Sequence, residues 1–130
     1  MAVPLRLAMQ AGLDRVPYFG NSRIMNIDDT AARLEALGNP TRLKAFRILV
    51  KAGGQGLSVG QLQERLGIAA STLTHHLQKL MLVGLVSQER QSTVLICRAN
   101  FAMMRSLVDA LASECCFDTR SRNVATSSNG

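Results

Sequence analysis

Residues 57–84 constrain the fold more than any other stretch, because they predict two helices joined by a tight turn. Ser58 stands where its side chain would accept a hydrogen bond from a free backbone N–H in the first turn of a helix. Gly67 would end that helix in the left-handed conformation that glycine readily adopts, and a second helix begins near Ser71. The apolar residues of the first helix recur three and four positions apart, which predicts one buried stripe: Val59, Leu62 and Leu66.

The second helix has two contrasting faces when its residues are spaced at about 100°. Its predicted core face consists of Leu73, Leu77 and Leu80. The opposite face carries hydroxyl, imidazole, amide and ammonium groups and no carboxylate: Ser71, Thr72, His75, Gln78 and Lys79. Such groups suit the base edges and phosphate oxygens of a DNA major groove. A solvated helix of an ordinary bundle fits the same periodicity, so the segment that follows decides between the two interpretations.

A two-stranded hairpin is predicted after Gly84. Val86 and residues 93–96 have strand propensity, and the polar residues 88–92 indicate the tip. Helix, turn, helix and hairpin is the order of elements in a winged helix–turn–helix. We therefore expect a mainly α fold with a two-stranded β-hairpin, in which Arg90 is the basic residue of the wing.

At this point the chain resembles the ArsR/SmtB family of bacterial metal-responsive repressors. The resemblance covers roughly residues 28–116 and is carried by LEALGNPTRLKAFRILV, by LSVGQLQERLGIAASTLTHHLQKLMLVGLV and by the hairpin. It implies a homodimer formed through the first and last helices, bound to operator DNA. Family members usually have a glycine and a basic residue at the wing tip, whereas this tip reads Arg90-Gln91-Ser92-Thr93.

The composition agrees with one DNA-binding domain. The chain has 130 residues, and residues 25–113 hold ten basic and six acidic groups, which favours a polyanionic partner. The apolar runs are too short for a membrane span, and three cysteines do not form the disulfide framework of a secreted domain. We therefore expect a cytoplasmic protein with no membrane partner. An enzyme is not expected, because His75 and His76 have no nucleophile beside them.

Three segments are expected: a flexible arm or over-extended start at 1–25, the winged domain at 26–114, and a cysteine-bearing sensory tail at 115–130. The first helix is expected to begin with Asp28 as cap and Asp29 in its first turn. Asn39 would cap the next helix, with Pro40 at its first position. The apolar residues of the first helix are Ala32, Leu34 and Leu37, and Leu43 belongs to the apolar face of the second. Four cations of the second helix are expected outside, where they would be solvated or would contact phosphates: Arg42, Lys44, Arg47 and Lys51.

The last helix ends in Cys115-Cys116, the one chemically distinctive site in the sequence. Two adjacent thiolates can bind one soft, thiophilic centre, although a structural coincidence explains the pair equally well by composition alone. Arg120 and Arg122 would lower the thiol pKa values, against Glu114 and Asp118. Cys97 is expected to be a small buried residue of the returning strand.

The resemblance also implies which ligand the cysteine pair would bind. The family's arsenic site in the recognition unit uses a C-V-C pattern, where this chain has Ser58-Val59-Gly60, and the zinc site of the last helix needs a histidine that is absent here. No zinc is therefore expected. The pair instead resembles the sites of arsenic-responsive repressors with vicinal cysteines after the last helix. Methylarsenite needs two thiolates and arsenite prefers three, with Cys97 as the only third candidate; antimonite, a thiol-redox signal and a metal-independent repressor stay open.

Overall fold

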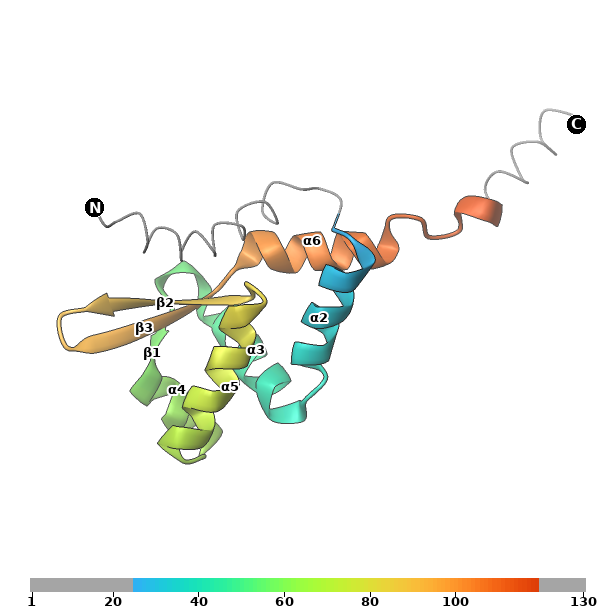
Figure 1. The fold of residues 1–130 in the computed structure, drawn as a ribbon. Helices are drawn as coiled ribbons and strands as arrows, with labels where there is room; N and C mark the ends of the chain where they lie inside the picture. The colour runs from blue at the N-terminus through green and yellow to red at the C-terminus, as the bar shows by residue number, and fades with distance from the viewer. Residues whose placement is uncertain (1–24, 120–130) are drawn as a thin grey trace, which may run out of the picture.

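The computed structural model describes residues 25–119 as five helices longer than one turn and a small sheet (Figure 1). The predicted N-terminal arm, apart from Met25, and residues 120–130 of the predicted tail lie outside this range. No helix of the described part is long and apolar enough to cross a membrane. In chain order the elements are α2 (Ile27–Leu37), α3 (Pro40–Ala52), a 3-10 turn (Gly53–Gln55), β1 (Leu57–Ser58), α4 (Val59–Leu66), α5 (Ala70–Leu82), β2 (Val86–Gln91), β3 (Val94–Ala99) and α6 (Phe101–Ala112).

Strands β2 and β3 form the predicted two-stranded hairpin, and β1, which was not predicted, pairs with β3 to give three antiparallel strands in the order β1-β3-β2. The extra strand is short: Leu57 pairs with Cys97 immediately before α4 begins. Gln91 pairs with Val94, which confines the turn of the hairpin to Ser92 and Thr93. The polar residues 88–91 predicted for the tip therefore belong to β2 instead.

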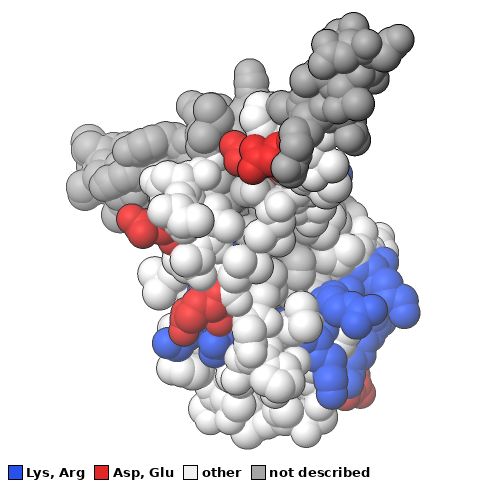
Figure 2. Space-filling model, turned by 90° about the vertical axis from the view of Figure 1, so that its right-hand side faces the viewer, with Lys and Arg blue, Asp and Glu red and all other residues white. Residues whose placement is uncertain are grey.

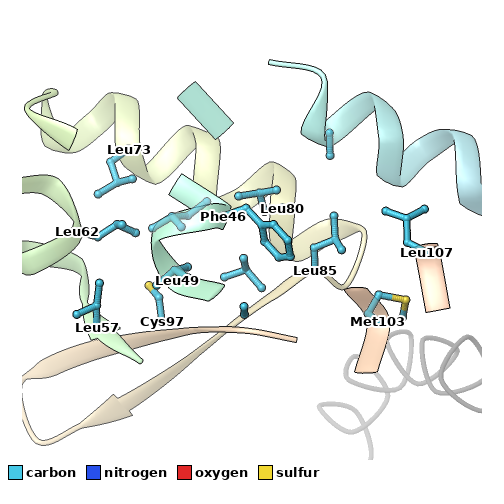
Figure 3. Packing of buried hydrophobic residues seen from close by; sticks show 14 residues of the cluster. Phe46, Leu49, Leu57, Leu62, Leu73, Leu80, Leu85, Cys97, Met103 and Leu107 are labelled. Carbon is cyan, nitrogen blue, oxygen red and sulfur yellow. The ribbon is translucent and has the colours of Figure 1, made fainter. Parts of the chain in front are cut away.

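The core is built mainly from leucines of the helix–turn–helix and its neighbours. Figure 3 shows these side chains pointing toward one another between the helices and the sheet. Cys97 is fully buried among them, as predicted. Truncation of such a leucine to alanine typically costs about 2–5 kcal/mol, so this cluster holds α4 and α5 against α3 and β3. Its fully buried leucines are Leu49, Leu62, Leu73, Leu77, Leu80 and Leu85.

The helix ends follow the local signals of the sequence with one exception. Ser58 and Gln61 form a reciprocal capping box at the start of α4, and Gly67 ends that helix with φ 66°. The Asn39 side chain accepts hydrogen bonds from two backbone amides of α3. The cap predicted for the first helix was wrong: Asn26 is the cap, and its Oδ1 accepts from the Asp29 amide at 2.8 Å.

Two arginines lie inside the protein, contrary to the predicted faces of α2 and α3. Arg33 is 2% exposed and Arg42 is 9% exposed, because their donors reach backbone carbonyls within the fold. Leu34 and Leu43 are instead 41% and 40% exposed. Lys44, Arg47 and Lys51 do remain outside, as predicted.

Candidate DNA-binding surface and cysteine site

Helix α5 presents the predicted polar face to solvent. Its predicted core leucines Leu73, Leu77 and Leu80 are buried, and the five candidate DNA-binding residues on this helix are exposed. Thr74 is exposed as well and was missed, although its helical position beside Gln78 indicates the same face. The exposed side chains of this face are Ser71, Thr72, Thr74, His75, Gln78 and Lys79.

His76 differs from His75 because it is half-buried and contacts α3. Its Nδ1 atom lies 3.4 Å from Nη1 of Arg42, whose Nε donates to the Ala36 carbonyl at 2.6 Å. Burial lowers the pKa of His76, and the charges of Arg42 and His75 lower it further. A neutral imidazole can accept the hydrogen bond from Arg42, so this pair links α5 to α3 between the polar face and the buried leucines of α5.

The wing is a short polar hairpin fastened to the body of the domain. Arg98 forms an ion pair with Glu89 at 2.6 Å and donates from Nε to the Gly54 carbonyl at 2.9 Å. The hydrogen bond from Arg98 is the main reason that the pKa of Glu89 is lowered. Arg90 is exposed near the tip and borders a hollow shared with Ser58 at the start of α4. A phosphate oxygen placed there would meet both a cation and a helix N-terminus.

A second basic surface lies on the outside of α3. Figure 2 shows Lys and Arg side chains gathered on one side of the molecule. Lys44, Arg47 and Lys51 line the edge of a groove whose other walls include Leu43 of the same helix and Met104 of α6. These three cations are available for phosphate contacts that add affinity without sequence preference.

The cysteine pair lies beyond the end of α6, and both thiols are exposed. Their sulfur atoms are 3.6 Å apart. This separation is far longer than a disulfide bond of about 2.05 Å. Two sulfurs bonded to one atom at about 2.3 Å each can lie at most about 4.6 Å apart, whatever the angle between the bonds. The spacing of the two thiols therefore suits one shared thiophilic atom.

The surroundings of the pair come from the first and last described helices. Cys115 borders a hollow of about 720 Å³ between the start of α2 and the end of α6, whose apolar lining includes Ile27 and Leu111 and whose polar lining includes Thr30 and Glu114. Figure 1 shows the chain after α6 leaving the body of the domain on the side away from the wing. Within residues 25–119, no three His, Cys, Asp or Glu side chains gather as a metal site.

Cys97 is not brought near the pair within one chain. It is buried under the wing, Gln88 Nε2 contacts its sulfur at 3.6 Å, and burial raises the pKa of its thiol. Helix α6, with 12 residues and a length of about 18 Å, separates it from Cys115. The predicted third ligand therefore has no support within a single subunit. Arg120 and Arg122, expected to tune the thiols, lie outside the described residues.

Comparison with known proteins identifies the fold and the regulators to which this chain is similar. A family of helix-turn-helix domains matches residues 37–89. The chain is 32% identical over 82 residues to the nodulation protein NolR of Rhizobium meliloti, a match that covers 63% of this chain and 65% of NolR, slightly less than two thirds of that protein.

Three solved structures share the fold. NolR from Sinorhizobium fredii is 30% identical, with a TM-score of 0.55 over 66% of this chain and 83% of its own. An ArsR-like transcriptional regulator from Rhodococcus is 21% identical, with a TM-score of 0.62 over 79% and 93%. The homodimeric winged helix-turn-helix DNA-binding domain of Mb0332 from Mycobacterium bovis, described as a possible ArsR-family regulator, is 28% identical, with a TM-score of 0.54 over 68% and 82%.

Fold and site together define a winged helix–turn–helix protein of the DNA-binding class. The chain carries a helix-turn-helix domain, and the solved structures that share its fold include regulators described as ArsR-like or as possible ArsR-family proteins. The predicted fold is confirmed and the resemblance to ArsR-family regulators is supported, while the arsenic-responsive type stays a prediction.

Proposed function

We propose that this chain is a homodimeric repressor that leaves its operator when a trivalent arsenical binds Cys115 and Cys116. The observation that carries the ligand is the pair of exposed thiols 3.6 Å apart at the junction of α2 and α6. The observation that carries DNA binding is the exposed, acid-free face of α5.

In this proposal α5 enters the major groove and the wing and α3 contact the backbone. Ser71, Thr72 and His75 lie nearest the start of α5, where recognition helices meet base edges. Gln78 and Lys79 follow on the same face. Arg90 and the cations of α3 would hold phosphates on either side, which makes the affinity depend on salt.

Dimerisation is supported by apolar faces that the described chain leaves uncovered. Val108 and Leu111 on α6 are 57% and 60% exposed, and Ile27 and Leu34 on α2 are 78% and 41% exposed. On each helix these residues lie within one turn or two of one another and beside the core face. A second copy would bury both faces, and a two-fold dimer would present two α5 helices to successive major grooves.

The number of available thiols favours an organoarsenical over arsenite. Methylarsenite already carries one carbon and needs two thiolates, which is the number of exposed cysteines within residues 25–119. Arsenite would need a third thiolate, and Cys97 of the same chain is buried elsewhere. Antimonite is subject to the same count as arsenite.

Ligand binding at the junction of α2 and α6 would act on DNA through the dimer. The two helices that border the cysteine pair also carry the exposed apolar faces, so a change in their packing alters the spacing of the two α5 helices. A coupling free energy of about 1–3 kcal/mol changes operator affinity about 5- to 150-fold, which is enough for a genetic switch.

Fluorescence anisotropy on the promoter DNA upstream of the gene tests this proposal at fixed salt concentration. Reduced protein is bound first, and methylarsenite, arsenite, antimonite, zinc or a thiol oxidant is then added separately. We expect release by methylarsenite at a lower dose than arsenite, and no release of the double variant Cys115→Ser, Cys116→Ser. Cys97→Ser is the matched control and should respond as wild type. Release of the double variant by methylarsenite would overturn the proposed site.

A thiol-redox repressor is the second candidate, because both cysteines of the pair are exposed and free. A bridge between subunits would require an oxidant and would appear on non-reducing electrophoresis. Release by the oxidant alone would favour this candidate. The resemblance to NolR, a protein named for nodulation, keeps a metal-independent repressor as the outcome if no ligand releases the DNA.

A further inference from the structure

The turn that ends helix α5 is held by groups from both α2 and the start of α6. Arg33 of α2 donates from Nε to the Val83 carbonyl at 2.8 Å. Asn100, the cap of α6, donates from Nδ2 to the Gly84 carbonyl at 3.1 Å and from its backbone amide to the Leu85 carbonyl at 2.8 Å. The two helices proposed to form the dimer therefore meet the end of the DNA-reading helix at one turn.

Of the two residues that hold this turn, Arg33 has the longer side chain, and it is almost completely buried. Burial lowers its pKa and the nearby Asp29 charge opposes that shift, but arginine stays protonated at any physiological pH. A buried cation is costly unless hydrogen-bonded acceptors surround it. The guanidinium has acceptors at both ends, since Nη1 also donates to the Asp29 carbonyl at 3.2 Å.

The guanidinium of Arg33 fixes the direction of its hydrogen bonds to the backbone. A guanidinium is a planar group with donors at fixed angles, so it orients the carbonyls that it binds. Val83 is the cap residue at the C-terminal end of α5, where free carbonyls carry the negative end of the helix dipole. Arg33 thus joins the backbone of α2 to the negative end of α5 through one rigid side chain.

The side of α2 next to Arg33 carries the exposed apolar residues Ile27 and Leu34. The same helix therefore faces the proposed partner subunit on one side and the end of α5 on the other. The hollow beside Cys115 borders the first turn of this helix, through Ile27 and Thr30.

We infer that Arg33 is a positioning residue that transmits the packing of the α2–α6 pair to the angle of helix α5. This inference rests on the proposed function, in that the packing of α2 and α6 is what the ligand changes. It assigns a route from the cysteine site to the DNA-reading helix that runs through a side chain touching neither ligand nor DNA.

Two measurements on Arg33→Met and Arg33→Lys test the inference. The first is the ratio of operator affinities without and with methylarsenite, for which wild type is expected to give about 5- to 150-fold. Arg33→Met should bring this ratio below about twofold, and Arg33→Lys, which keeps the charge but not the planar fork, should give an intermediate value. Leu49→Ala is the control for lost stability, because it removes a buried side chain of α3 and should leave the ratio at the wild-type value.

The second measurement is hydrogen exchange at the Gly84 and Leu85 amides, which donate to the Met81 and Leu80 carbonyls. Arg33→Met should speed exchange there about tenfold or more relative to amides in α3, whereas Leu49→Ala should not single out this turn. If wild type is not released by methylarsenite, the proposed ligand fails, and the exchange measurement alone decides the role of Arg33. Wild-type exchange at both amides in Arg33→Met, or an unchanged affinity ratio in a wild-type protein that does respond, would overturn the inference.

Discussion

The Nδ1 atom of His76 and the Nη1 atom of Arg42 are 3.4 Å apart, which joins helix α5 to α3 by an imidazole and a guanidinium. The contact is favourable only while the imidazole is neutral, because protonation would place two cations against each other. This is one reason why the pKa of His76 is lowered, after the larger effect of burial.

The free energy of unfolding should fall as the pH is lowered from about 7.5 to about 5, a range that brackets the ordinary histidine pKa. The folded state binds a proton at His76 less readily than the unfolded state does, so the loss begins near the unfolded pKa of about 6.5 and levels off below the folded value. Urea unfolding at several pH values measures this slope. His76→Gln should flatten it, whereas His75→Gln removes only the smallest of the three causes and should keep most of it. An unchanged slope in His76→Gln would contradict the assignment.

Thiol labelling should separate the three cysteines. Iodoacetamide is expected to modify Cys115 and Cys116 in the folded protein and to leave Cys97 unmodified, because Cys97 is fully buried and its pKa is raised. Mass spectrometry after short labelling counts the modified thiols, and the same experiment in denaturant should modify all three. Equal labelling rates for Cys97 and the pair under native conditions would mean that β3 opens readily.

Charge placed on the exposed face of α6 should separate the subunits. Leu111→Glu would bury a carboxylate in the proposed dimer interface, which shifts the protein toward monomer and weakens operator binding. Sedimentation velocity measures the change. Leu82→Glu is the matched control for the oligomeric state alone, because Leu82 is 83% exposed and lies on α5, outside the proposed interface. A dimer that tolerates Leu111→Glu would place the interface elsewhere.

The basic surface of α3 and the polar face of α5 should contribute differently to DNA affinity. Arg47→Gln is expected to weaken binding to operator and to unrelated DNA alike and to reduce the slope of log affinity against log salt by about 1. His75→Ala should weaken operator binding by about 1–3 kcal/mol and unrelated DNA much less, if it reaches a base edge. Anisotropy titrations at several salt concentrations distinguish the two patterns. The same pattern for both variants would remove the distinction between α3 and α5.

Sequence alone predicted most of the features that depend on nearby residues, with the Asn26 cap of α2 as the exception. The caps at Ser58 and Asn39 each act within three residues, so their signals are local, whereas the reciprocal bond from Gln61 was not predicted. The exposed face of α5 followed from periodicity for the same reason. Strand β1 was missed because it is two residues long and its partner Cys97 comes 40 positions after Leu57.

The buried arginines were missed for a related reason. Arg33 is stable inside the protein because Val83, 50 positions later, supplies a carbonyl, and no local pattern announces such a partner. At the cysteine site, the adjacency of the thiols was evident from the sequence. The hollow that Cys115 shares with the start of α2 was not, because the two segments are brought together only by the packing of α2 against α6.

Residues 111–119 are all exposed, and none of them belongs to the hydrophobic core. The leucine cluster that shapes the DNA-reading unit would therefore assemble in the same way with a different sequence after Ala112. A segment that binds a different ligand can therefore be joined after Ala112, while the helix–turn–helix unit keeps its sequence and its packing.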